Sequence, residues 1–472
     1  GVPKTSFVND IKADLHDQNK VYVALDNHKF GDYRPFLYKS ENGGKTWKSI
    51  TNGLPKETLV WRIVQDHVDP NLLFLATEYG IYFSNSQGNS WIKLSNGLPT
   101  ISVRDLAIQK RENDLVIATF GRGFYVLDDY SSLRFLNKET SKDFILFDVK
   151  ESLQYNPVRS GSDSQGASYF TSKNPPYGAI FSYFVPDSYK TIKTERKKLE
   201  KEINKSKKNI PFSGWDKLDD EQNENLPKLI LEVRDDNGDL ITRLDASTKK
   251  GFNRTAWNLS NPIVTTLNSK SNSRRRYYEP SVAVKSGIYS VELIEIKNGK
   301  HRKLSVSKKF NVKKIRNNIL SNPIESKIDG FLTDLVDLQT EIELSLNLFN
   351  KSKDKLLKFE KALSYVDIDN DNLSIEIYKL IKEMENIESQ ISGNKSKKEI
   401  GEKDYPTVSD RLSVAQRGFY GNSYGPTKLH LDSFELGKKQ WESVKLSIKI
   451  FIQSVSNKNQ ILEKIGSPII LN

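Results

Sequence analysis

The sequence contains no cysteine among its 472 residues, and it has only one methionine and five histidines. The absence of cysteine excludes disulfides, thiolate zinc sites and cysteine nucleophiles, although it does not identify the cellular compartment. No run of about 20 apolar residues occurs, so we expect no membrane-spanning helix. The five histidines lack the spacing of metal ligands, and we expect neither a metal nor another cofactor.

Catalytic signatures are also missing. The sequence has no nucleophile elbow, no phosphate-binding glycine loop and no Ser-Lys motif. The segment from Asp367 to Asn372 resembles the start of a calcium loop, but Asn372 replaces the expected glycine and Tyr378 stands at the twelfth position. An acidic helix N-terminus explains this segment better. The sequence therefore identifies no catalytic residue, although Asp26, Asp66, Glu78 and Asp105 are candidate carboxylates for glycoside hydrolysis.

The chain is basic, with a net charge of +12 from 72 Lys and Arg against 60 Asp and Glu. Much of the lysine lies in charged helices and loops, where a solvated surface is the simplest interpretation. Attraction for anionic polymers is the alternative. The segment from Arg274 to Tyr278 joins three arginines to two tyrosines, but it lies in a Ser/Asn-rich loop. We do not expect a nucleic-acid-binding protein.

One stretch of the sequence occurs twice. Residues 40–55 read SENGGKTWKSITNGLP, and residues 84–99 read SNSQGNSWIKLSNGLP. The matching residues are each 44 positions apart, which is the length of a four-stranded propeller blade. They are the pairs Ser40/Ser84, Gly44/Gly88, Trp47/Trp91, Asn52/Asn96 and Pro55/Pro99.

The residue types of this stretch predict a tight turn between two strands. Gly44 supplies a positive φ, and Ser40 and Asn42 accept hydrogen bonds from amides of their own turn. A large aromatic then begins the next strand and must be covered by a neighbouring sheet. We therefore expect Trp47 and Trp91 to be buried between sheets, and Gly44 and Gly88 to lie in turns.

Residues 1–140 contain three groups of short strands around these turns. Each group has an alternating strand, a small-residue apolar strand, an aromatic strand and a fourth strand that begins near Trp47, Trp91 or Leu133. Four-stranded units of this length predict three blades of a β-propeller, because each sheet buries its faces only against the next.

The repeated turn resembles the Asp-box, or bacterial neuraminidase repeat, of sialidases, xyloglucanases and sortilin-like propellers. Asn42 and Ser86 stand where that pattern has aspartate. Residues 118–129, ATFGRGFYVLDD, resemble the closing segment of a bacterial sortilin-like family that is often labelled glycosyl hydrolase. This segment contains Gly121, Arg122, Gly123, Asp128 and Asp129, and we expect Arg122 to pair with one of the two aspartates. Phe120 replaces the family's usual histidine, so no role of that histidine is carried over.

The rest of the chain predicts two further parts. Residues 141–315 contain a linker, a charged helix at 191–207 and several short alternating strands, which indicate an immunoglobulin-like β-sandwich with Trp257 in its core. Residues 316–472 contain three long helical stripes, which predict a helical bundle. A Gly/Tyr-rich loop at 417–427 caps the bundle or contacts a partner through Phe419, Tyr420 and Tyr424.

The resemblance implies an exported bacterial protein, located in the periplasm, on the outer membrane or outside the cell. Recognition of protein or peptide partners, or a scaffolding role, is the leading hypothesis. The alternative is a glycoside hydrolase whose active site lies largely in other blades. Three blades cannot close a ring, so we expect a second polypeptide, such as the N-terminal part of the same precursor, to complete the propeller. Other cell-envelope proteins or a glycan are further candidate partners.

Overall fold

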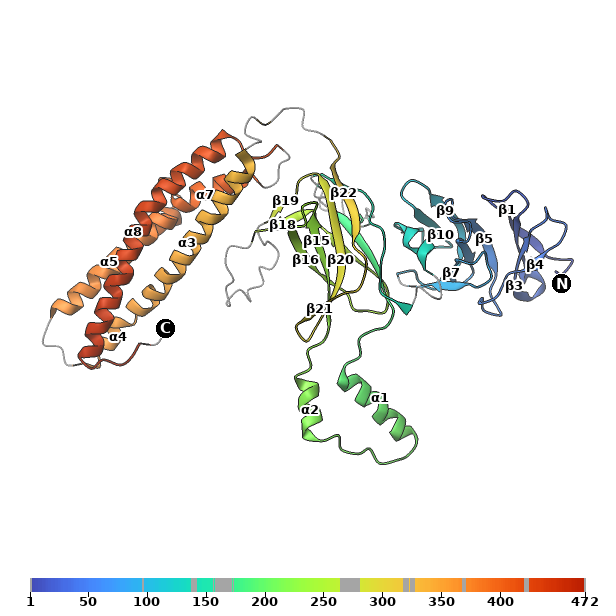
Figure 1. The fold of residues 1–472 in the computed structure, drawn as a ribbon, viewed down its shortest axis with the longest axis horizontal. Coiled ribbons are helices and arrows are strands. Elements are labelled where there is room, and N and C mark those ends of the chain that lie inside the picture. Colours follow the sequence, from blue (N-terminus) through green and yellow to red (C-terminus); the bar gives the residue numbers. More distant parts are fainter. Residues whose placement is uncertain are drawn as a thin grey trace.

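The protein is described by a computed structural model that covers residues 2–95, 97–136, 142–155, 157, 172, 174–263, 281–316, 322, 327–366, 371–419 and 424–470. Three small sheets come first, a group of larger sheets follows, and long helices form the C-terminal part (Figure 1). The cluster at 274–278, Asn96 and Tyr420 lie outside the described residues. In the described part, no helix is both long and apolar enough to cross a membrane.

The first two sheets each contain four antiparallel strands in sequence order. The first sheet consists of β1 (Phe7–Ala13), β2 (Val21–Asn27), β3 (Asp32–Ser40) and β4 (Lys48–Ser49). The second consists of β5 (Val60–Gln65), β6 (Leu73–Thr77), β7 (Gly80–Ser84) and β8 (Ile92–Leu94). A short 3-10 helix, η1 (His28–Phe30), precedes β3. These strands lie where the repeat predicts them.

The second sheet is covered on both faces. All five residues of β6 and all five of β7 are buried, because alternate side chains face different neighbours. Leu73 and Leu75 join a core shared with the first sheet, whereas Phe74 and Ala76 join a core shared with the third. In β2, by contrast, buried and half-buried residues alternate along most of the strand. Within the described part of the chain, one face of the first sheet is therefore covered and the other only partly so.

The third sheet has three strands, not four, in the described part of the chain. It contains β9 (Val103–Gln109), β10 (Asp114–Thr119) and β11 (Phe124–Leu127). The predicted strand near Leu133 is wrong, because Tyr130–Phe135 form a 3-10 helix, η2. Asp129 explains the change: its backbone is left-handed at φ 41°, and its side chain accepts a hydrogen bond from the Ser131 amide at the start of the helix.

Two larger sheets enclose one apolar core. One contains β12 (Ile145–Leu146), β14 (Ala179–Val185) and β17 (Gly251–Trp257). The other contains β13 (Ser152–Gln154), β15 (Lys228–Asp235), β16 (Leu240–Ala246), β20 (Gly287–Lys297), β21 (Lys300–Lys303) and β22 (Lys308–Lys314). A two-stranded pair, β18 (Ser260–Pro262) and β19 (Ser281–Ala283), lies beside them. Trp257 is buried in the core, as predicted, and its indole nitrogen donates to the Ser260 carbonyl oxygen at 2.9 Å.

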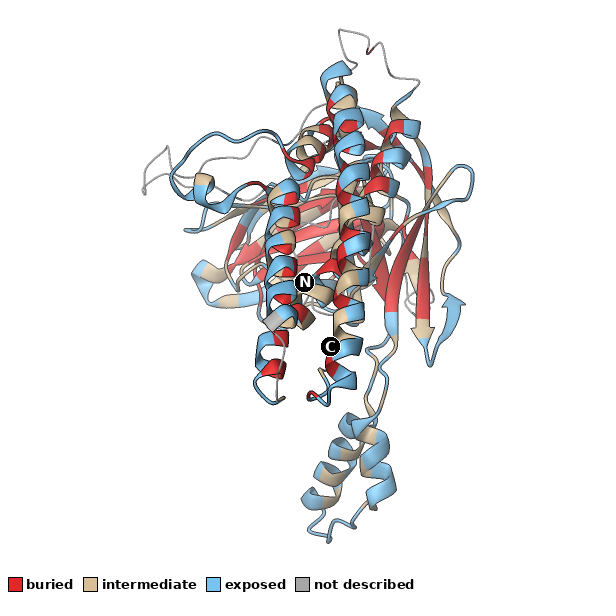
Figure 2. Ribbon diagram, turned by 90° about the vertical axis from the view of Figure 1, so that its left-hand side faces the viewer, coloured by how far each residue is buried: buried red, intermediate tan, exposed pale blue. Residues whose placement is uncertain are grey.

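A helical hairpin projects from this group of sheets between β14 and β15 (Figures 1 and 2). Its first helix, α1 (Ile192–Lys205), was predicted, whereas the second, α2 (Trp215–Gln222), was not. Neither helix contains a buried residue. The hairpin is held by the ion pair between Arg196 and Glu221.

The C-terminal helices pack around a continuous apolar core, as the three stripes predict. They are α3 (Ile328–Leu356), α4 (Phe359–Leu363), α5 (Asp371–Ser392), α6 (Lys395–Glu399), α7 (Val408–Arg417) and α8 (Lys428–Lys464). Trp441 lies fully buried in α8 and donates from its indole nitrogen to the Glu341 carboxylate of α3 at 3.0 Å. Residues 367–370 of the calcium-like segment are outside the described part, and α5 begins directly after them.

Candidate functional site

The first copy of the repeated turn follows β3. The Ser40 hydroxyl accepts a hydrogen bond from the Gly44 amide at 2.9 Å. The Asn42 side-chain oxygen accepts one from the Thr46 amide, also at 2.9 Å. These two side chains hold the turn closed. Asn42 therefore accepts the amide hydrogen bond at the position where the Asp-box pattern has aspartate.

The second copy follows β7 and uses the same two hydrogen bonds. The Ser84 hydroxyl accepts from the Gly88 amide at 3.0 Å, and the Ser86 hydroxyl accepts from the Ser90 amide at 3.2 Å. Gly44 and Gly88 have φ values of 86° and 82°, in the left-handed region that glycine tolerates. The two turns therefore have one construction despite their different sequences.

The two tryptophans of the repeat differ sharply in their surroundings. Trp91 is only 4% exposed, and its indole nitrogen donates to the Ile50 carbonyl oxygen of the preceding sheet at 2.6 Å. Trp47 is 44% exposed, so the prediction that it is buried is wrong. The reason is that the sheet before its own covers Trp91, whereas the described residues place no sheet before the first one to cover Trp47.

The segment 118–129 is a hairpin that connects the third sheet to the following sheets. Gly121 and Gly123 have positive φ values of 88° and 66°. Arg122 is exposed, and its expected pairing with Asp128 or Asp129 is not among the ion pairs of the described residues.

A different arginine, Arg254, binds the backbone oxygens of these two aspartates. The Arg254 guanidinium of β17 donates to the carbonyl oxygen of Asp128 at 2.7 Å and to that of Asp129 at 2.5 Å. The Lys150 ammonium lies 3.5 Å from the Asp129 carboxylate. Burial and the nearby Asp114 carboxylate raise the pKa of Asp128. The segment is thus a junction between two groups of sheets.

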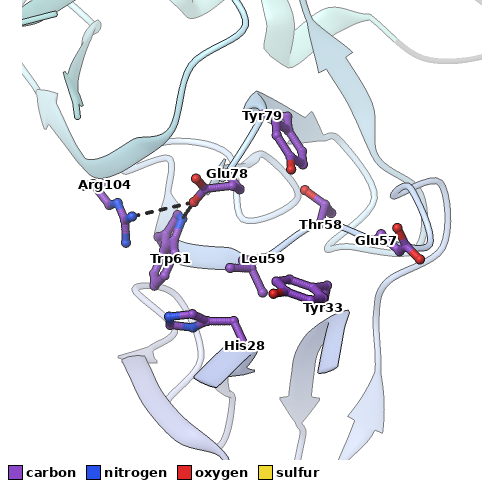
Figure 3. A pocket seen from close by; sticks show the side chains of 9 residues that line it. All are labelled: His28, Tyr33, Glu57, Thr58, Leu59, Trp61, Glu78, Tyr79 and Arg104. Atoms are coloured by element: carbon purple, nitrogen blue, oxygen red, sulfur yellow. Dashed lines mark hydrogen bonds and ion pairs between the residues drawn. The ribbon is translucent and has the colours of Figure 1, made fainter. Parts of the chain in front are cut away.

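A pocket of about 470 Å³ opens where the connections of the first three sheets meet (Figure 3). Its lining comes from η1, from the start of β3, from the link between the first two sheets, from β5, from the β6–β7 turn and from β9. The lining residues are His28, Tyr33, Glu57, Thr58, Leu59, Trp61, Glu78, Tyr79 and Arg104. Residues from three sheets therefore build one concave site.

One wall of the pocket is a fixed group of four side chains. The Arg104 guanidinium stacks on the Trp61 ring at 3.8 Å from its centre, and His28 meets the same ring edge-on. The Trp61 indole nitrogen donates to Oε2 of Glu78 at 2.9 Å. Because Arg104 already lies over one face of Trp61, that face is not open to a ligand.

The polar groups of the pocket are partly unused. Ser102 also donates to Oε2 of Glu78 at 3.0 Å, and Arg104 approaches the same oxygen at 3.7 Å. Among the described residues, no hydrogen bond or ion pair reaches Oε1 of Glu78. The Thr58 hydroxyl is buried and has no hydrogen-bond partner in the described part. The buried Thr58 hydroxyl thus remains unpaired in the described part, which is uncommon for a buried polar group, and the partly exposed Oε1 of Glu78 is open to a ligand.

Two tyrosines give the pocket its free aromatic surface. Tyr33 and Tyr79 are 53% and 52% exposed, and both rings lie in the pocket lining (Figure 3). Glu57 is exposed at the side of the pocket. The arrangement offers two aromatic rings and two carboxylates to a ligand, which suits a cation or a polar sugar.

Of the four carboxylates that the sequence suggests, only Glu78 lies in the pocket. Asp26 contacts His28, Asp105 accepts from Arg62, and Asp66 is buried against Arg134. Tyr33, at the start of β3, and Tyr79, in the β6–β7 turn, carry no sequence signal of their own, because they meet only when their sheets pack. Among the described residues, no group of three His, Asp or Glu side chains is arranged to hold a metal ion.

The Gly/Tyr-rich loop lies at one end of the helices. Phe419 packs against Phe331 of α3, with ring centres 5.2 Å apart. Asn322 donates to the backbone oxygens of Tyr424 and Pro426, both at 2.9 Å. These contacts hold Phe419 on α3 and the backbone of Tyr424 and Pro426 beside Asn322, while residues 420–423 lie outside the described part. The suggested role of the loop in partner contact remains a prediction.

The sequence matches no family model and no curated protein. Among solved structures, it is similar to the GH74 xyloglucanase from Xanthomonas campestris, with 12% identity, a TM-score of 0.21, and coverage of 37% of this chain and 26% of that one. An ancestral GH74 enzyme has 14% identity, a TM-score of 0.22, and coverage of 62% and 42%. An extracellular domain from B. thetaiotaomicron has 12% identity, a TM-score of 0.19, and coverage of 66% and 37%. The chain spans less than half of each of these structures, and TM-scores this low carry no argument.

Proposed function

We propose that this chain is part of an exported recognition protein. In this proposal, the three small sheets of residues 1–140 are blades of a β-propeller, residues 141–315 include an immunoglobulin-like sandwich, and residues 316–472 form a helical bundle. The ligand-binding site is the pocket between the first three sheets, and the ligand is a lysine or arginine side chain of a protein or peptide partner. Detection of the chain in the periplasmic, outer-membrane or extracellular fraction tests its export.

The observation that carries this function is the unpaired oxygen of Glu78 beside two half-exposed tyrosines. Donors already occupy Oε2 of Glu78, so Oε1 remains available to accept from an ammonium or guanidinium group. The rings of Tyr33 and Tyr79 attract a cation through their π faces, and Glu57 adds a second negative charge. The pocket lining thus carries two carboxylates and two free aromatic rings against one guanidinium, that of Arg104, within a chain whose net charge is +12.

Binding of short peptides to the full chain tests the proposal. Tri-lysine and tri-arginine should bind, and the same peptides with acetylated lysines or with citrulline should not. Glu78→Gln should weaken binding roughly tenfold or more, because it removes a charge-assisted hydrogen bond. Glu112→Gln is the matched control, since Glu112 is an exposed carboxylate of the third sheet. Equal affinity of the parent and of Glu78→Gln would contradict the proposed site.

A second candidate function is glycoside hydrolysis. Glu57 and Glu78 line one pocket, and a glycosidase needs two carboxylates on either side of the sugar bond. Incubation with xyloglucan and with sialosides tests it. We expect no turnover. Hydrolysis that is abolished by Glu57→Gln and by Glu78→Gln, but not by Glu112→Gln, would establish the enzyme in place of the recognition protein.

A further inference from the structure

The contact between the first and second sheets shows how one sheet covers the repeated turn of the next. The chain after β4 lies across Trp91: the Trp91 amide donates to the Asn52 carbonyl oxygen at 3.1 Å, and Asn52 donates from its side chain to the Asn89 carbonyl oxygen at 3.0 Å. A Cβ on Gly53 would lie 2.7 Å from the Trp91 carbonyl oxygen, so only glycine permits this approach. Ile50 fills the remaining space, since a Cβ on Gly88 would lie 2.7 Å from its Cδ1.

The strands of the second sheet contribute an apolar row to the same contact. Ile63, Leu75 and Tyr82 are direct neighbours across three strands, so their side chains share one face. They are 1%, 0% and 5% exposed, and all three belong to the core shared with the first sheet. The row and the turn with Trp91 together make up the surface that the first sheet covers.

The first sheet has the same surface on its other face, and no sheet among the described residues covers it. Ile11, Val23 and Tyr38 are direct neighbours across β1, β2 and β3 and form the corresponding row. Ile11 is 63% exposed, and Val23 and Tyr38 are only half-buried. Trp47, the counterpart of Trp91 in this sheet, is 44% exposed. A Cβ on Gly44 would meet nothing within 4 Å except the ring of Trp47 at 3.7 Å.

We propose that this open face of the first sheet binds a further four-stranded blade of the same type, supplied by another stretch of polypeptide. We call the surface formed by Ile11, Val23, Tyr38 and Trp47 the open face. The occupant must present an apolar strand face. Its last strand must be followed directly by a segment that contains an apolar residue and then Asn-Gly. Residues 50–53 of this chain present that chemistry to Trp91.

A second copy of the chain does not fit this requirement through its third sheet. That sheet has no fourth strand in the described part, and η2 stands in its place. It therefore lacks the segment that would cover Trp47 and accept a hydrogen bond from its indole. The blade must come from a different stretch of polypeptide, and this inference does not depend on the ligand of the pocket.

The chain's own first sheet is a ready-made probe for the open face. A tandem variant carries an additional copy of residues 4–56 directly ahead of Lys4, so that the copied segment 50–53 can cover the original Trp47. Because the chain has no cysteine, Ile11→Cys in the original sheet introduces a unique thiol for maleimide labelling. Val68→Cys is the control, since Val68 is 57% exposed in the connection between β5 and β6 and is not part of the open face.

The additional blade should slow labelling of the Ile11→Cys thiol by about tenfold or more, because labelling would then require the blade to detach. Labelling of Val68→Cys should not change. Replacing Ile50 by serine and Gly53 by valine within the additional copy should restore fast labelling. A folded tandem protein with an unprotected Ile11→Cys thiol would overturn the proposal.

A longer tandem variant keeps the test decisive if the single additional sheet does not fold. It carries a copy of residues 4–99 ahead of Lys4, so the added unit contains its own core between two sheets. The residues after the copied β8 repeat the Asn-Gly-Leu-Pro sequence and lie next to the open face. Protection of the Ile11→Cys thiol is again expected. Its absence in this folded variant would equally contradict the proposal.

Discussion

The indole nitrogen of Trp91 donates a hydrogen bond to the backbone oxygen of Ile50, and this contact joins the second small sheet to the first. Trp91 belongs to one copy of a repeated turn, and Ile50 lies just after the fourth strand of the preceding sheet. The turn is therefore more than a local device for reversing the chain. It also forms the side of a sheet against which the neighbouring sheet packs.

The two tryptophans of the repeat should differ in their contribution to stability. Trp91→Ala should lower the free energy of unfolding by about 3–5 kcal/mol, because it leaves a cavity between two sheets and removes the hydrogen bond to Ile50. Trp47→Ala should cost less than about 1 kcal/mol, because much of that indole is already in water. Chemical denaturation of both variants measures the difference. Equal losses would mean that Trp47 is covered in solution.

A buried ion pair between Asp66, just after β5, and Arg134 of η2 predicts a response to acid. Asp66 is fully buried and accepts hydrogen bonds from Arg134 at 2.7 and 2.9 Å and from the Tyr130 hydroxyl at 2.7 Å. Burial alone would raise the pKa of Asp66, but the bonds from Arg134 and Tyr130 outweigh it and lower the pKa below the ordinary 3.8. The stabilisation is thus complete above pH 3.8 and is lost as the pH falls further, through the lowered pKa.

Asp66→Asn tests this pair. It should lower the free energy of unfolding by about 3–5 kcal/mol near neutral pH, because the Arg134 charge stays largely buried without its partner. It should also reduce the loss of stability that the parent undergoes below pH 3.8. Asp105→Asn is the control, since Asp105 is 55% exposed in its ion pair with Arg62 and should contribute at most about 1 kcal/mol. An unchanged acid profile in Asp66→Asn would refute the assignment.

The sequence predicts the small sheets well because their signals are local. Strand alternation, paired glycines and the 44-residue spacing all lie within one or two strands of the residues they describe. Leu133 shows where such signals fail: the segment is apolar enough for a strand, but the left-handed backbone at Asp129 turns it into a 3-10 helix. The short α2 was missed because its eight residues offer too little helical periodicity.

The exposure of Trp47 and the composition of the pocket could not be predicted in the same way. Both depend on which sheets are neighbours. A repeat gives the spacing between sheets in the sequence, but it does not show which sheet lacks a neighbour on one face. Tyr33 and Tyr79 belong to different sheets and meet only when those sheets pack. Of the residues that line the pocket, only Glu78 is one of the four carboxylates that the sequence suggests, because an acidic residue in a turn between strands is visible in the sequence.

The open face should make the isolated chain associate. Ile11 and Trp47 are large apolar side chains that are both well exposed on one face, and such patches favour contacts with other molecules. We expect the sedimentation coefficient of the purified chain to rise with concentration. The double variant Ile11→Lys/Trp47→Lys should suppress this rise by placing two charges on the face, whereas Val68→Lys should not. A compact monomer at every concentration would mean that the face needs no cover and would remove the physical reason for a missing blade.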